Sequence, residues 1–285
     1  MKNFKYIYML PVAVCLMLLT GCSDEDYLGG HATADGMGTL LGVTGQVDQS
    51  VNTTFMAGDA IGIATSYANH DQTARNRKYE LQSDGRSFLP ANNLPIYVKG
   101  NTSVMAYYPF AGDDNAEPTL TLNTENQSAT VDLLLAKVDG ITIGNASSVN
   151  LNFKPALATL KVNIDATGET ISEYLLSGFA QQGAVDPYSF EVTPGVIKDI
   201  KGTGTAITSL LFHIVPQTVA DGTAVLTLKG TVRTYRLSLG TVMLGLSESA
   251  QLNVNIADGM ATYEFVPAGT QWEDSGLGDA NATSN

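Results

Sequence analysis

The chain has 285 residues, of which 44% are apolar, 15% are charged and two are cysteines. Its 28 acidic and 15 basic residues give a net charge of −13, and such a surface repels phosphate backbones, which argues against nucleic-acid binding. So few cysteines exclude a fold held by several disulfides or a thiolate metal site. The apolar fraction and the length suffice for one large domain or two of ordinary size.

The first 21 residues predict a signal peptide. Lys2 and Lys5 form a short basic region, and an apolar stretch of about 14 residues follows from Tyr6 to Leu19. This stretch is shorter than the roughly 20 residues that a transmembrane helix needs. The next segment, LLTGC, resembles a bacterial lipobox, in which the bond between Gly21 and Cys22 is cut and the cysteine is acylated. The alternative is an ordinary secretory signal beside a coincidental cysteine.

From Cys22 onward we expect a lipid-anchored mature chain with 13 basic and 28 acidic residues, because Lys2 and Lys5 leave with the signal. Each buried CH₂ of an acyl chain such as palmitate contributes roughly 0.8 kcal/mol, so a multiply acylated cysteine holds the protein at a membrane. Residues 22–36 contain the acidic run SDED and predict a solvated, flexible tether. The run is also similar to the export tag of Bacteroidetes lipoproteins, which implies the outer face of the outer membrane.

Alternation of apolar and polar residues dominates the rest of the chain and predicts an all-β architecture of the sandwich type. The run 160–164 alternates cleanly. Two hairpins are predicted, one from 225–228 and 232–237, the other from 252–256 and 263–265 across Asp258-Gly259. Further strands are expected near 39–47, 60–66, 77–82, 94–98, 103–108, 119–123, 130–136, 171–179, 188–192 and 209–215.

A turn-rich stretch at 144–150 is the best internal boundary. It predicts an N-terminal β-sandwich over residues 37–146 and a C-terminal β-sandwich over residues 147–267, each near the usual domain size. The polar tail, residues 268–285, is expected to be disordered apart from Trp272.

No pattern indicates an enzyme or a cofactor. The histidines, His31, His70 and His213, lie far apart in sequence. His213 interrupts an apolar run, and we interpret it as a strand residue that points outward or is satisfied by a neighbour rather than as a catalytic base. A nucleophile elbow, a His-Glu-x-x-His helix and a phosphate loop are all missing from the sequence. Paired glycosidase carboxylates would meet only in three dimensions, and the sequence favours no pair.

Two segments admit both a binding role and a structural one. Residues 113–115, Asp-Asp-Asn, could offer oxygens to Ca²⁺, but the alternating spacing of an EF-hand loop is absent. We therefore expect a surface turn after Pro109 and no metal site. Residues 107–110, Tyr-Tyr-Pro-Phe, could form a stacking platform for sugars. We favour a strand end whose alternate rings face the core, with Pro109 stopping the pairing.

Five segments, in this order, together resemble the fimbrillin-like pilus lipoproteins of the Bacteroidetes. They are FMAGDAIGI at 55–63, AYYPF at 106–110, DLLLA at 132–136, NFKPALATL at 152–160 and VPQT at 215–218. The chain departs from the family pattern at Pro155, where histidine is usual, and at Thr159, where lysine is frequent. The resemblance implies two transthyretin-like domains and a subunit of a type V pilus or fimbria that acts in cell adhesion.

The resemblance also implies assembly by donor strand exchange: an incoming strand fills the groove left when an Arg- or Lys-specific protease removes a subunit's first strand. The first strand here would be residues 39–47, with Leu41 and Val43 as strand-exchange positions. Tyr263 and Phe265 are the candidate donor residues, with Trp272 as a further candidate.

The chain resists this simplest version, because no Lys or Arg occurs between Cys22 and Arg75. Arg75, Arg77 and Lys78 form the only dense basic cluster, which is either a solvated loop or an exposed protease site. We expect a non-enzymatic anchor or accessory subunit whose partners are other pilus subunits, the outer membrane and a host protein or glycan. The alternatives are a polymerising stalk subunit cut at this cluster, and a glycan-binding lipoprotein that uses exposed tyrosines and Trp272.

Overall fold

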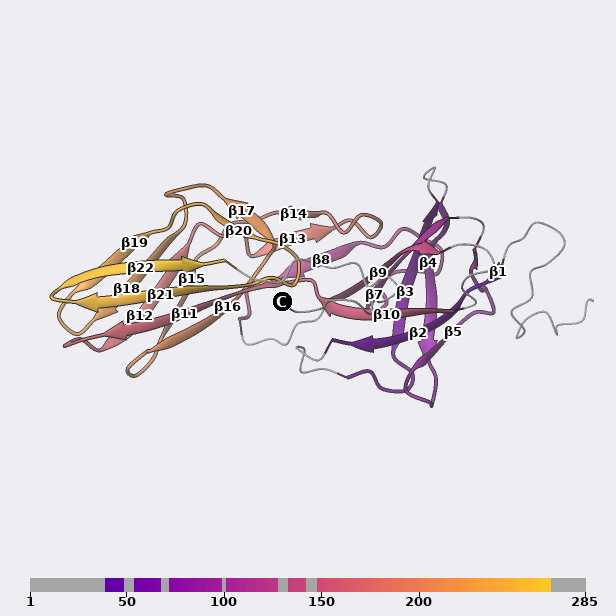
Figure 1. Ribbon diagram of the computed structural model, residues 1–285, viewed down its shortest axis with the longest axis horizontal. Helices are drawn as coiled ribbons and strands as arrows, with labels where there is room; N and C mark the ends of the chain where they lie inside the picture. The colour runs from indigo at the N-terminus through magenta and orange to yellow at the C-terminus, as the bar shows by residue number, and fades with distance from the viewer. Residues whose placement is uncertain are drawn as a thin grey trace, which may run out of the picture.

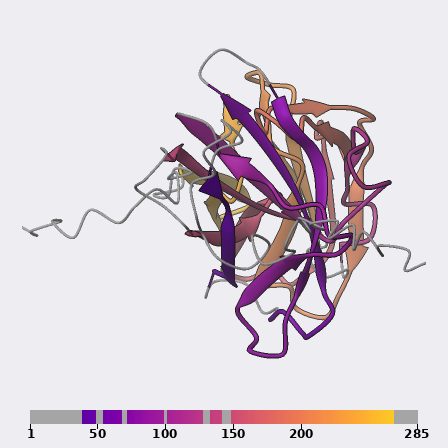
Figure 2. The same ribbon diagram turned by 90° about the vertical axis from the view of Figure 1, so that its right-hand side faces the viewer.

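The structure is a computed structural model that describes residues 39–48, 54–67, 72–98, 101–127, 133–141 and 148–267. Within these ranges the protein is all-β, as predicted, and contains no helix that could cross a membrane. The signal peptide, Cys22 and its tether, His31, His70 and the tail at 268–285 lie outside the described residues. The strands form two groups toward opposite ends of an elongated molecule (Figure 1). Figure 2 looks along the molecule, with indigo-to-magenta strands of the first group in front.

The first group is a sheet that closes on itself in the order β10-β2-β5-β4-β3-β7-β9, with β10 pairing β9. Its strands are β2 (Gly42–Val47), β3 (Ala60–Tyr67), β4 (Gln72–Leu81), β5 (Ser87–Pro90), β7 (Thr102–Tyr108), β9 (Leu134–Ile141) and β10 (Ser148–Pro155). β1 (Thr39–Leu40) pairs with β6 (Tyr97–Val98) in a separate two-stranded sheet, and these two strands directly precede β2 and β7 in the sequence. The β2–β10 pair is parallel and the other pairs of this sheet are antiparallel.

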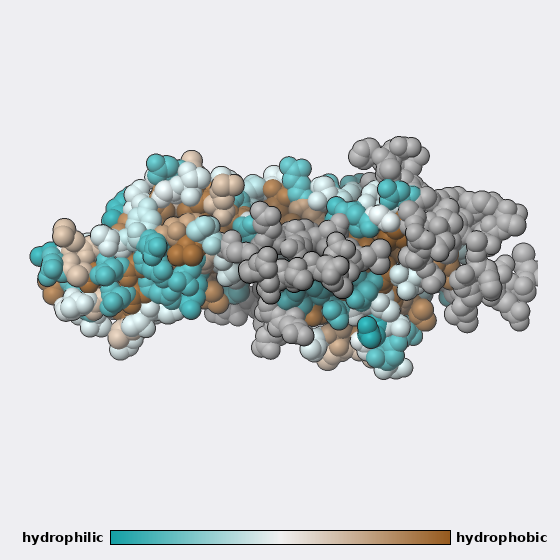
Figure 3. Space-filling view, viewed as in Figure 1, coloured by the Kyte–Doolittle hydropathy of each residue, from teal (hydrophilic) through white to brown (hydrophobic). Residues whose placement is uncertain are grey.

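The second group consists of two four-stranded sheets that share one apolar core. One sheet contains β16 (Ser209–Ile214), β11 (Ala158–Ala166), β21 (Ser249–Ala257) and β22 (Met260–Val266), in that order. The other contains β15 (Ile200–Thr203), β12 (Ile171–Ser177), β18 (Val225–Gly230) and β19 (Thr234–Ser238). On β11, Leu160 and Val162 are buried while Lys161 between them is exposed, which is the alternation that the sequence predicted. Hydrophilic and near-neutral residues cover most of the coloured face in Figure 3, consistent with apolar side chains packed inside.

A third sheet joins the two groups. In it, β8 (Leu120–Asn123) pairs with β13 (Gln182–Val185), which also pairs with β14 (Val192–Pro194). A two-stranded sheet, β17 (Gln217–Val219) with β20 (Val242–Leu244), completes the described strands. A shared core contains Tyr107 and Leu133 from before residue 146 and Phe190 and Val215 from after it.

The predicted boundary at residue 146 falls inside this arrangement. β10 lies beyond it in sequence, yet it pairs with β2 in the first sheet. The passage to the second group occurs in the short link between β10 and β11. The division into 37–146 and 147–267 stays a prediction, and any second unit built on the observed pairing would begin after β10.

One predicted hairpin is confirmed, and one predicted strand is wrong. The Asp-Gly hairpin is confirmed, since Asp258 and Gly259 both have positive φ (54° and 77°) between β21 and β22. The strand expected at 188–192 is wrong for most of its length. Residues 187–189 form a turn in which the Asp186 carboxylate accepts hydrogen bonds from the backbone N–H groups of Tyr188 and Ser189 (2.8 and 2.7 Å). These side-chain bonds replace the ladder that a strand would make.

Candidate functional site: the slot of the first strand

The expected first strand at 39–47 is divided into β1 and β2, which are separated by Leu41, and β2 lies within the closed sheet with a neighbouring strand on each side. It pairs in parallel with β10 and antiparallel with β5, so that Val43 lies opposite both Val149 and Phe88. Further main-chain bonds continue this pairing, from Gly45 N to the Arg86 carbonyl (3.0 Å) and from Asp48 N to the Phe153 carbonyl (2.8 Å). The strand therefore has main-chain partners on both sides.

The inward face of β2 closes the first core. Val43 on β2 and Leu41, which directly precedes the strand, are 4% and 2% exposed. Gly45 continues this row, and a Cβ built on it would lie 3.0 Å from the Phe88 ring and 3.2 Å from the Phe153 ring. Glycine thus allows the strand to lie directly on two buried aromatic rings. Burial of Leu41 and Val43 contributes about 1.5–3 kcal/mol each to the free energy of folding. Loss of this segment would therefore destabilise the core.

An aromatic cluster lies beneath the strand. Phe55 contacts Phe88, Phe153 and Tyr108 edge-on, with ring centroids 5.5, 5.2 and 5.1 Å away. The alternation of Leu41, Val43, Gly45 and Val47 was the signal in the sequence that could have marked Gly45 as a point of close approach. Nothing in the sequence places Phe55 next to rings that lie about 30 and 100 residues further along the chain.

The basic cluster lies within β4, where the structure corrects the interpretation as a solvated loop. Arg77 pairs with Ile63 and Lys78 with Gly62 on β3, and the next residue, Tyr79, also pairs with Pro90 on β5. An Arg77–Asp114 ion pair has an N–O distance of 3.2 Å, and Lys78 forms one with Glu80 at 2.7 Å. Arg75 is exposed. A protease that binds its substrate as an extended, unpaired segment would have to open this sheet first.

A buried polar network holds the cluster in place. The Asn76 side chain is fully buried, and its Nδ2 donates to the carbonyls of Ala111 and Asp113 (2.9 and 3.1 Å). Its Oδ1 accepts a hydrogen bond from the Tyr107 hydroxyl at 2.7 Å. Burial raises the pKa of Tyr107, which therefore keeps its proton and donates it. The Asp114 Oδ1 also accepts a hydrogen bond from the backbone N–H of Lys78 (2.9 Å). The segment after Pro109 is thus fastened across β4.

For both segments within residues 107–115, the sequence allowed a binding role or a structural role, and this network shows a structural one. The structural interpretation of the aromatic segment is confirmed, because Tyr107 is 2% exposed and Tyr108 packs on Phe55. The Asp-Asp-Asn segment forms the expected turn, but Asp114 is engaged with Arg77 rather than open to a cation. Among the described residues there is no group of three or more His, Cys, Asp or Glu that could hold a metal ion.

The proposed donor residues lie on β22, an edge strand whose described partner is β21. Tyr263 is 36% exposed, and its hydroxyl donates to the Ser238 carbonyl (2.9 Å) and accepts from Gly240 N (3.0 Å). Phe265 is partly buried against the second core. Both side chains are therefore docked on their own chain, and Trp272 lies outside the described residues.

His213 agrees with the expectation in part. It lies on β16 between the buried Phe212 and Ile214, so its side chain points away from the core of the second group and is half-buried. Its Nδ1, however, is buried without a hydrogen-bond partner in the part of the chain that the structure describes. Burial lowers the pKa of the imidazole, which favours the neutral form.

Comparisons with known proteins agree with this architecture. The family described as fimbrillin-like matches residues 49–262, and no curated protein matches. A candidate cell adhesion protein from Bacteroides uniformis superposes with a TM-score of 0.58 and 19% identity over 81% of this chain and 99% of its own. One from Bacteroides ovatus gives 0.56 and 18% over 81% and 98%. The tip fimbrial protein Mfa3 from Porphyromonas gingivalis gives 0.50 and 10% over 80% and 98%. At such identities the solved structures show a shared fold.

Proposed function

The chain belongs to the fimbrillin-like family, and we propose that it is a non-enzymatic anchor or accessory subunit of a surface pilus that acts in cell adhesion and keeps its own first strand. The observation that carries this proposal is the position of β2, which is paired on both sides and lies on buried rings. A subunit that accepts a partner's strand at this position must first lose β2.

The chain offers no simple way to lose it. The first Lys or Arg after Cys22 is Arg75, and that residue lies within β4. A cut there would separate β2, all of β3 and the start of β4 from the rest of a single closed sheet. Removing so much of one core costs far more than the loss of one strand, and the remaining strands would lack main-chain partners. A subunit that retains β2 cannot accept another subunit's strand between β10 and β5. Retention of β2 therefore fits a subunit that ends a filament.

The lipid anchor is part of the same proposal. It rests on the lipobox-like sequence before Cys22 and on the acidic tether that separates this residue from Thr39. An acylated Cys22 would place the closed sheet, which contains β2, at the end of the protein that faces the membrane. Strand addition between subunits would then use other edges of the protein.

Limited digestion with an Arg- and Lys-specific protease tests the proposal. Arg86 lies exposed in the turn between β4 and β5 and provides an internal reference, because a cut after it requires only the end of the β2–β5 pair to open, at the Gly45 N–Arg86 carbonyl bond, and not a whole strand. We expect the Arg86 bond to be cut first, with residues 39–86 still bound to the remainder after the cut, as measured by site-resolved mass spectrometry and native gel filtration. Rapid cleavage after Arg75 or Arg77 with release of the segment that contains β2 would contradict the proposal.

A further inference from the structure

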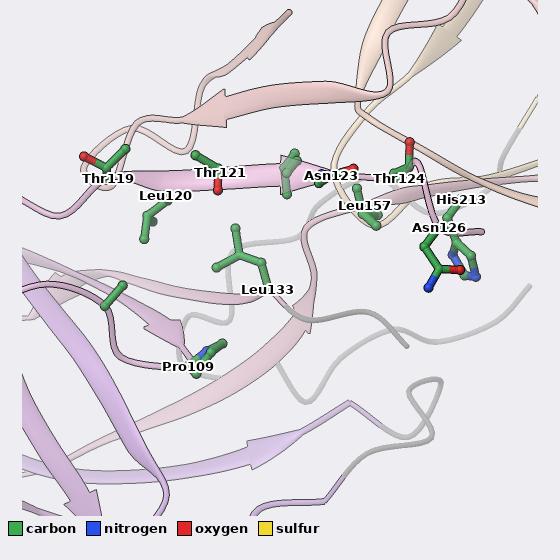
Figure 4. Close-up of a pocket in the computed structure, with 12 residues that line it drawn as sticks. Pro109, Thr119, Leu120, Thr121, Asn123, Thr124, Asn126, Leu133, Leu157 and His213 are labelled. Atoms are coloured by element: carbon green, nitrogen blue, oxygen red, sulfur yellow. The ribbon is translucent and has the colours of Figure 1, made fainter. Parts of the chain in front are cut away.

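A cavity of about 300 Å³ lies where the two groups of strands meet. β8 lies along one side, Pro109 and Leu133 lie across from it (Figure 4), and Leu157 also lines the cavity. His213 and Asn126 lie together at one end. The cavity thus combines an apolar wall with a strand edge and a histidine.

The wall formed by β8 is a free sheet edge, since among the described strands β8 pairs only with β13. The N–H of Thr124 donates to the Gln181 carbonyl at 2.8 Å, which shows that the main-chain groups of Thr124 face β13. In an antiparallel pair, successive residues direct their main-chain groups to opposite sides. The N–H and C=O groups of Thr121 and Asn123 therefore point away from β13 and can pair with an added strand.

The histidine end of the cavity is fixed in position and has an open acceptor. The Gln127 side chain donates to the His213 carbonyl (3.0 Å) and accepts from the His213 N–H (2.8 Å), as a neighbouring strand would. The buried Nδ1 of His213 has no hydrogen-bond partner among the described residues. A neutral imidazole nitrogen in this state can accept one N–H donor, and leaving it unpaired is costly.

The chain beyond β22 is long enough to reach the histidine end of the cavity on β16. Val266 pairs with Gln251, Gln251 with Lys161 and Lys161 with Leu211, so the end of β22 is three strand spacings, about 14 Å, from β16. β22 runs toward the row of the sheet that contains His213. Trp272 is the sixth residue beyond Val266, and six fully extended residues span at most about 20 Å.

We propose that residues 270–273 of this chain add to the free edge of β8 as an extended strand and that the indole of Trp272 fills the cavity. The indole packs against Leu133 and Leu157, and its N–H donates to Nδ1 of His213. Main-chain groups on the same segment pair with Thr121 and Asn123. Glu273 and Asp274 remain in solvent, because no acidic or permanently charged side chain lines the cavity.

Trp272 is the only tryptophan, so its fluorescence in the mature chain reports this contact directly. We expect blue-shifted emission and protection from acrylamide quenching, both independent of protein concentration. Thr121→Arg should shift the emission to that of the urea-unfolded chain. Thr193→Arg is the matched control and should leave the emission unchanged, because Thr121 and Thr193 are both exposed and pair with Ala184 from opposite sides.

His213→Ala provides a second test that does not disturb β8, and it should remove part of the protection from quenching. Circular dichroism before each measurement identifies any variant that fails to fold. Native emission equal to that of the unfolded chain would overturn the proposal, as would equal effects of Thr121→Arg and Thr193→Arg. Protection that disappears on dilution would assign the cavity to the tail of a second copy and would also overturn it.

Discussion

Asn76→Ala should loosen the basic cluster by removing the polar network that fastens β4. Three side-chain hydrogen bonds disappear, to the carbonyls of Ala111 and Asp113 and from the Tyr107 hydroxyl. Tyr107 retains a bond to the Ala111 carbonyl (2.9 Å), so the loss is not complete. At about 1 kcal/mol for each bond, with a small cavity added, the free energy of unfolding should fall by about 2–4 kcal/mol.

The same change should increase protease cleavage at the cluster. If cleavage requires β4 to open and opening is fast relative to cutting, each 1.4 kcal/mol raises the rate about tenfold. Cleavage after Arg75 and Arg77 should therefore accelerate by about 30- to 700-fold, while cleavage at the exposed Arg86 stays nearly constant. Site-resolved mass spectrometry during digestion measures the three bonds in one sample, and urea denaturation gives the stability.

Asn163→Ala is the matched control, because Asn163 makes one side-chain bond, to Asn253 at 2.9 Å, in the second group of strands. It should cost about 1 kcal/mol and leave the cluster protected. Unchanged stability and unchanged cleavage in Asn76→Ala would refute the role of the polar network. Cleavage of the unaltered protein at Arg75 as fast as at Arg86 would show that β4 does not protect the cluster.

Three further predictions concern the same packing and the histidine. Val43→Ala should lower the free energy of unfolding by about 2 kcal/mol in urea titrations, whereas Gln46→Ala on the exposed face of β2 should change it by less than about 0.5 kcal/mol; equal effects would show that β2 is not part of the core. Gly62→Ala should cost about 1–3 kcal/mol by thermal unfolding, because its Cβ would lie 2.2 Å from the Tyr107 ring, and an unchanged melting temperature would refute that contact. Burial lowers the pKa of His213 below its ordinary 6.5, so the unfolded state binds the proton first and stability should fall as the pH drops below about 6.5. His213→Gln should flatten that slope between pH 7 and 5, and an identical slope in both proteins would contradict the assignment.

Much of the fold follows from local pattern. The expected strands at 60–66, 103–108 and 209–215 agree closely with β3, β7 and β16, because alternate apolar residues must face one core. β13 and β15 were missed, since each is four residues long and neither alternates clearly. Short strands of this kind are fixed by their partners rather than by their own sequence.

The site could be predicted only in part. The sequence placed Leu41 and Val43 on a first strand, and it showed that no basic residue lies between that strand and Arg75. It did not show that β2 pairs with β10, about 105 residues later, because long-range pairing leaves no local signal. The sequence left the basic cluster as either a solvated loop or an exposed protease site, because Arg, Asn, Arg and Lys are polar, whereas Asn76 is buried by partners from beyond Pro109.

Mass spectrometry of the N-terminus of this protein, recovered from the surface of the cells that make it, tests the central claim most directly. Retention of β2 predicts a single N-terminus at an acylated Cys22. A dominant N-terminus at Asn76 or Lys78, or just after Lys78, would show that the first strand is removed and would make the protein a cleaved, polymerising subunit.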